Sequence, residues 1–143
     1  MIRNIIVICL LVISAKLNSS SIIVITDPMQ RQNTIYRFEL QSIYMLRYVE
    51  WDSGLPVVPI YMSFESDNHV KFVKHTLNLS IHNFRRDIES KIINGGAFKV
   101  YIAASKLEVL TLLKSIPGSI AYIDEYTILM GVDDDIKTIS IID

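Results

Sequence analysis

The sequence contains little cysteine and no excess of basic residues. Its single cysteine, Cys9, lies within an apolar run near the N-terminus. The rest of the chain therefore forms no disulfide and offers no thiolate for catalysis or for a metal site. Lysine and arginine total 14 residues against 15 aspartate and glutamate residues. Because nucleic-acid binders usually show a basic excess or stripe, we expect no nucleic-acid partner, and we expect Arg85 and Arg86 to form a solvated face.

Signature motifs of the common enzyme classes are also missing. The sequence has no nucleophile elbow, no Walker A loop and no dinucleotide-binding glycine fingerprint. The three histidines are spaced by six and seven residues, so they do not share one helix face, and we expect them to be exposed. They are His69, His75 and His82. The sequence therefore predicts a protein that is not an enzyme and that has no metal site and no cofactor.

Two clusters of acidic residues need a separate interpretation. Residues 133–135 are three consecutive aspartates, and Asp124 is followed by Glu125. Calcium loops place acidic ligands at alternate positions and add a glycine turn and a distal glutamate, which neither cluster does. We therefore expect both clusters to be solvated charge.

The first residues have the layout of a secretory signal peptide. A short positive start, residues 1–4, precedes an apolar run over residues 5–13 and the small residues Ser14 and Ala15. An uncleaved anchor is the alternative, but the run is far shorter than the roughly 20 residues that span a membrane. We expect residues 1–15 to be a signal peptide, with later cleavage within residues 17–20 as the variant. Residues 16–143 then form one domain with no stable membrane span.

Apolar strand patterns alternate with helix patterns along the rest of the chain. The expected strands cover residues 21–26, 56–62, 98–103, 119–123 and 136–142. The expected helices cover residues 35–47 and the segments that begin at Ser66, Ser80 and Ser105, each of which can cap a helix. Pro59 marks a strand edge or an irregularity, because proline cannot donate to a ladder. This alternation predicts an α/β domain with a largely parallel sheet flanked by helices.

One strand-to-helix connection has a physical reason to bind a ligand. Residues 63–68 lead from the end of an expected strand into an expected helix N-terminus. Ligands of open α/β sheets lie beyond the carboxyl ends of the strands, and a helix N-terminus favours anions. The candidate binding residues are Ser63, Ser66, Asp67 and Asn68. The alternative is that Ser66 only caps its helix.

Four stretches occur in an order that is typical of a known family. They are residues 21–28 (SIIVITDP), Glu39-Leu40 and Ile43-Tyr44 followed by Trp51 and Gly54, residues 56–60 leading to Ser66, Phe72 and Leu77, and residues 117–122 (PGSIAY). In this order the chain resembles the phosphate-type substrate-binding proteins of ABC transporters, within the type 2 periplasmic-binding superfamily. It is most similar to short members that cover a single lobe.

The resemblance implies a periplasmic location and a single periplasmic-binding-protein-like lobe. It also implies an oxyanion ligand, phosphate by default, held at the serine loop, where Ser66 matches the family's anion-contacting serine. An alternative remains open, because Glu65 and Asp67 place negative charge in this loop. The lobe would then keep the fold without the ligand and dock to an envelope protein. A partner chain or self-association could also supply the wall that a single lobe lacks.

Overall fold

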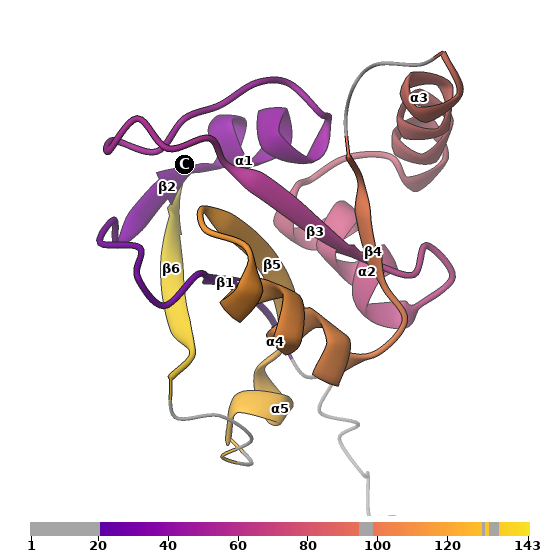
Figure 1. Cartoon of the computed structure of the whole chain (residues 1–143). Helices are drawn as coiled ribbons and strands as arrows, with labels where there is room; N and C mark the ends of the chain where they lie inside the picture. The colour runs from indigo at the N-terminus through magenta and orange to yellow at the C-terminus, as the bar shows by residue number, and fades with distance from the viewer. Residues whose placement is uncertain (1–20, 95–98, 130, 132–134) are drawn as a thin grey trace, which may run out of the picture.

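The computed structural model describes residues 21–94, 99–129, 131 and 135–143 (Figure 1). The expected signal peptide, residues 1–15, lies outside the described residues, as do Asp133 and Asp134 of the acidic triplet. Within the described part of the chain, no helix has the length and apolar character needed to cross a membrane.

Six strands form one mixed sheet. They are β1 (Ile22–Thr26), β2 (Thr34–Tyr36), β3 (Val58–Met62), β4 (Tyr101–Ala103), β5 (Ser119–Asp124) and β6 (Lys137–Ile142), in the order β2-β6-β1-β5-β3-β4. β1 pairs antiparallel with β5 and β6, and the other three pairings are parallel. Among these six strands β1 therefore runs against the other five. The prediction of a mainly parallel sheet in an α/β domain is confirmed.

Helices pack against the sheet and bury its apolar strands. They are α1 (Arg37–Tyr44), α2 (Asp67–Lys71), which continues as the π-helical turn η1 (Phe72–Thr76), α3 (Ile81–Ile93), α4 (Lys106–Ser115) and α5 (Glu125–Leu129). α4 packs on β3, β4 and β5, while α1 and α2 also contact β3 (Figure 1). All six residues of β5 are buried, as expected for a central strand with both faces covered.

A cluster of aromatic rings joins the ends of β3 and β5 to the helices. The rings of Phe72 and Tyr122 stack at 3.9 Å between centroids, and Tyr44 meets Phe72 edge-on at 4.7 Å. The hydroxyl group of Tyr61 donates to the carbonyl oxygen of Tyr44 at 2.6 Å, and that of Tyr122 accepts from the backbone N–H of Met62 at 2.9 Å. These contacts satisfy buried polar groups and hold the carboxyl end of β3 against β5.

The predicted helix caps are present. The hydroxyl oxygens of three serines accept hydrogen bonds from backbone N–H groups in the first turns of α2, α3 and α4; the serines are Ser66, Ser80 and Ser105. At α4 the carboxylate of Glu108 accepts from the backbone N–H of Ala104 at 2.8 Å, one residue before the cap. The local sequence therefore determines where these three helices begin.

Two predicted elements differ from the structure. The helix expected over residues 35–47 begins only at Arg37, because Ile35 lies in β2 and pairs in parallel register with Ile141 of β6. Pro59 lies in an interior strand, where the pairing of β3 passes from β5 at Pro59 to β4 at Ile60. Pro59 therefore does not mark a sheet edge.

Candidate functional site

Three parallel strands end side by side at one edge of the sheet, and a helix follows each of them. β3 ends at Met62 before α2, β4 ends at Ala103 before α4, and β5 ends at Asp124 before α5. Because parallel strands share a direction, the first turns of these helices lie at the same edge. This carboxyl edge is where open α/β sheets bind their ligands.

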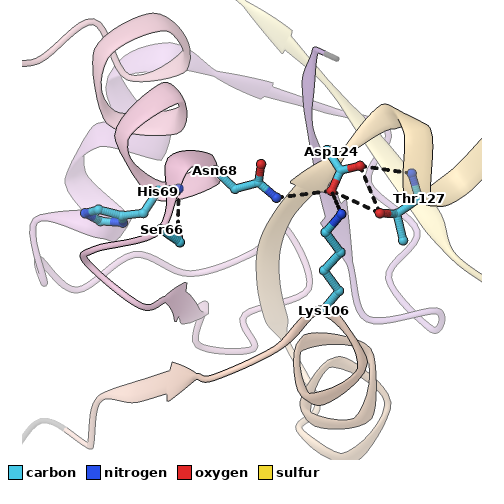
Figure 2. A network of polar contacts seen from close by, with 6 residues as sticks. All are labelled: Ser66, Asn68, His69, Lys106, Asp124 and Thr127. Atoms are coloured by element: carbon cyan, nitrogen blue, oxygen red, sulfur yellow. Dashed lines mark hydrogen bonds and ion pairs between the residues drawn. The ribbon is translucent and has the colours of Figure 1, made fainter. Parts of the chain in front are cut away.

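The carboxylate of Asp124 connects the three helices at this edge, as Figure 2 shows. Its Oδ1 accepts from the side-chain amide of Asn68 on α2 at 3.1 Å and pairs with Nζ of Lys106 on α4 at 2.5 Å. Its Oδ2 accepts from the backbone N–H of Thr127 on α5 at 3.1 Å, and the hydroxyl group of Thr127 lies 2.9 Å away. The carboxylate therefore has donors from α2, α4 and α5.

The interpretation of the Asp124-Glu125 pair as solvated charge is wrong for Asp124. Asp124 is only 3% exposed, whereas Glu125 is exposed. Burial by itself raises the pKa of the Asp124 carboxyl, but hydrogen bonds from Lys106, Thr127 and Asn68 outweigh burial and bring the pKa to about 2. Asp124 is therefore a buried anion at neutral pH.

The four predicted ligand residues lie in the loop before α2 and in the first turn of that helix, and one of them joins this network. Asn68 donates to Asp124. Ser66 lies two residues before Asn68 in the chain, and the hydroxyl oxygen of Ser66 accepts from the N–H of His69 at 3.2 Å (Figure 2). Ser63 is half-buried at the end of β3, where its backbone N–H donates to the carbonyl of Ala103. Asp67 is exposed in the first turn of α2.

Lys106 and Asp124 are the members of the edge that sequence reasoning missed. Lys106 keeps nearly half of its side chain exposed while its ammonium group reaches Asp124. The spacing Asp124-x-x-Thr127 after a buried strand is a helix-cap signal, and this pattern could have revealed α5 and the role of the aspartate. Nothing in the local sequence indicates that Asn68 or Lys106 would meet it.

The expectation that the histidines are exposed is confirmed for His75 and His82 and is wrong for His69, which is 1% exposed. Its Nδ1 lies 2.7 Å from the hydroxyl oxygen of Tyr122, which already accepts from Met62. Nδ1 and the Tyr122 hydroxyl group share one hydrogen bond. The other ring nitrogen, Nε2, is buried, with no hydrogen-bond partner among the described residues. Burial and the nearby charge of Arg85 lower the pKa of His69 to about 4.

The edge brings one ammonium group and one amide donor to a single buried carboxylate, and the hydroxyl group of Ser66 caps the helix that carries the amide. This set of groups suits an anion, because cationic and N–H donors form the stronger, charge-assisted hydrogen bonds to carboxylate or phosphate oxygens. In the structure the bound anion is the chain's own Asp124 (Figure 2).

The sequence matches no known family model and no curated protein sequence. Solved structures do match the fold. One, from Clostridium perfringens, is assigned as a phosphate ABC transporter substrate-binding protein and holds bound phosphate; its TM-score is 0.65 at 14% identity, over 85% of this chain and 45% of that one. PstS from Borrelia burgdorferi matches with a TM-score of 0.65 at 17% identity, over 85% of this chain and 47% of its own.

An ABC-type phosphate transport receptor from Vibrio cholerae is similar as well, with a TM-score of 0.62 at 13% identity over 85% of this chain and 46% of that one. The chain thus spans about half the length of the structures that it resembles. At such low identity the likeness concerns the fold, and it confirms the predicted resemblance at that level. The chain has the fold of a single lobe of the phosphate-type substrate-binding proteins.

Proposed function

We propose that the chain is a non-enzymatic, phosphate-type oxyanion-binding lobe that acts in the periplasm. Two kinds of observation support the proposal. The structures that share its fold are described as substrate-binding proteins or receptors for phosphate transport, and one of them holds phosphate. The observation on this chain that carries the proposal is the cluster of anion donors at the carboxyl edge.

Two of the donors, on α2 and α4, meet at one atom, Oδ1 of Asp124, and a third belongs to the serine that caps α2. Asn68 offers an amide, Lys106 an ammonium group, and Ser66 a hydroxyl proton that its role as a helix cap leaves available. Ser63 precedes them in the loop, and Asp67 contributes its backbone N–H, which has no acceptor within its own helix. Such a set holds an oxyanion by charge-assisted hydrogen bonds without any covalent step.

The location is proposed from the first residues of the sequence. Residues 1–15 are taken as a signal peptide that directs the chain to the periplasm. Mass spectrometry of the protein recovered from a periplasmic extract tests this point, because cleavage after Ala15 leaves Lys16 as the first residue. An intact Met1 on the recovered protein would contradict the proposed cleavage, and absence of the protein from the periplasmic extract would contradict the proposed export.

The first prediction concerns Ser66. We expect phosphate to bind the purified protein in titration calorimetry, and we expect Ser66→Ala to weaken the binding about tenfold, because the variant loses one hydrogen bond to a charged ligand. The same substitution removes the cap of α2 and costs about 1 kcal/mol of stability. A matched control is therefore needed.

Ser80→Ala is that control, because Ser80 caps α3 in the same way and lies outside the carboxyl edge. Both variants should lose similar stability, and only the Ser66 variant should lose affinity for phosphate. Equal affinities in the two variants would remove Ser66 from the site. No heat in millimolar phosphate with the unmodified protein would contradict the proposed function itself.

A second function is favoured by a different observation. Aromatic and aliphatic side chains are exposed at the β2 edge of the sheet, where Tyr36 stacks on Phe38 at 5.5 Å and pairs with Ile142. These side chains are 47%, 64% and 38% exposed, respectively. An exposed apolar patch of this kind is typical of protein–protein contacts. In this alternative the lobe docks to an envelope protein or to a second copy of itself.

Light scattering separates the two proposals. A docking lobe with an apolar β2 edge should show self-association or partner binding that Phe38→Ser weakens and phosphate leaves unchanged. If the lobe instead binds phosphate, titration calorimetry should give the same phosphate affinity with and without Phe38→Ser.

A further inference from the structure

The two donors that the proposed function assigns to phosphate already share an acceptor. Both the amide of Asn68 and the ammonium group of Lys106 reach Oδ1 of Asp124, at 3.1 and 2.5 Å (Figure 2). Asp124 is nearly completely buried, so its carboxylate forms these contacts in place of water. An oxyanion that uses the same donors must compete with this oxygen.

Capping of α5 does not account for these contacts. The cap consists of the bond from the Thr127 N–H to Oδ2, which connects residues three apart in the sequence. The contacts of Oδ1 connect Asp124 to Asn68, 56 residues away, and to Lys106 on α4. A serine or an asparagine would cap α5 as well as an aspartate does. The negative charge therefore has a separate consequence at the edge.

We propose that Asp124 is a built-in competitor of the bound oxyanion: its carboxylate occupies the donors of Asn68 and Lys106, and phosphate binds by displacing it. This inference rests on the proposed function. Two anions on one ammonium group repel each other strongly in a partly buried site. The carboxylate therefore weakens phosphate binding and keeps the donors satisfied while the site is empty.

Two variants test the competition. Asp124→Asn and Asp124→Ser both remove the charge, and both retain a residue that caps α5. We expect phosphate to bind each variant at least tenfold more tightly than it binds the unmodified protein in titration calorimetry. Glu125→Gln is the charge-matched control, since Glu125 directly follows Asp124, is exposed and is not among the proposed phosphate contacts. That variant should change the affinity by less than threefold.

The unmodified protein provides a second readout that needs no variant at Asp124. The backbone N–H of Thr127 bonds to Oδ2 of the carboxylate and is not among the proposed phosphate contacts. If phosphate displaces the carboxylate, the amide resonance of Thr127 should shift together with the side-chain amide of Asn68 in an NMR titration. A Thr127 resonance that stays in place at saturating phosphate would overturn the competition.

The outcomes distinguish this inference from the proposed function. Phosphate binding that is equal in the unmodified protein and in both Asp124 variants would overturn the inference and leave the function standing. Binding by the variants alone would support the inference and contradict phosphate capture by the natural sequence. No binding by any of them would contradict both.

Discussion

Replacing Gly118 with alanine is expected to lower the free energy of unfolding by at least about 3 kcal/mol, because strain and a steric clash act together. Gly118 has a φ of +78°, and a Cβ atom there would lie 2.4 Å from the carbonyl oxygen of Pro56. Its N–H donates to the buried carboxylate of Asp27 at 3.0 Å, and its carbonyl accepts from Val58 and from the indole of Trp51. A shift of the backbone at Gly118 would disturb all of these bonds.

Gly54→Ala separates the two causes. Gly54 has a similar φ of +84°, but an added Cβ would meet nothing within 4 Å. Its replacement should therefore cost only the strain, about 1 kcal/mol. Urea unfolding of both variants measures the difference. If the two substitutions had equal effects, the close approach of Pro56 to Gly118 would not be a constraint on the fold.

Acidification from pH 6.5 to pH 4 is expected to remove up to about 3 kcal/mol of stability through His69 alone. The pKa of His69 is lowered from 6.5 to about 4 in the folded protein, first by burial and then by the charge of Arg85. Between these two values the unfolded chain binds more protons than the folded one, so stability falls as the pH falls. Above pH 6.5 this contribution is constant.

The Asp124 carboxyl adds a second, lower window. Its pKa falls from 3.8 in the unfolded chain to about 2 in the fold, so its contribution is complete above pH 4 and is lost as the pH approaches 2. Urea unfolding at a series of pH values measures both windows. His69→Phe should flatten the slope between pH 6.5 and 4, whereas replacement of the exposed His82 by glutamine should leave it unchanged. An identical slope in the His69 variant would contradict the buried, neutral histidine.

Elements with a local cause could be predicted from the sequence. β1, β3 and β5 are short apolar runs bounded by turn residues, and Ser66, Ser80 and Ser105 cap the helices that follow them. β2 could not be predicted, because its three residues are extended through pairing with β6, about a hundred residues later in the chain. α5 is only five residues long, which is too short for a helical period to be visible, so its local signal is the capping aspartate Asp124.

The candidate site could be predicted only in part, for the same reason. Residues 63–68 connect a strand pattern to a helix cap, so this candidate binding segment could be identified from the local sequence. The network at Asp124 depends on side chains that the sheet topology brings together from three separate helices. Burial of His69 did have a local signal, since His69, Phe72 and Val73 share one helix face and all three are buried.

Phosphate titration of two lysine variants of α4 tests the position of the anion site most directly. Lys106 lies in the first turn of the helix, at the carboxyl edge, whereas Lys114 lies in its last turn and lines a cavity of about 460 Å³ with Asp27 and Arg31. Each substitution by methionine removes one positive charge from the same helix. We predict that Lys106→Met weakens phosphate binding at least tenfold, the loss expected for a charge-assisted hydrogen bond, and that Lys114→Met changes it less than twofold. Equal effects, or a larger loss in the Lys114 variant, would contradict an oxyanion site at the carboxyl edge.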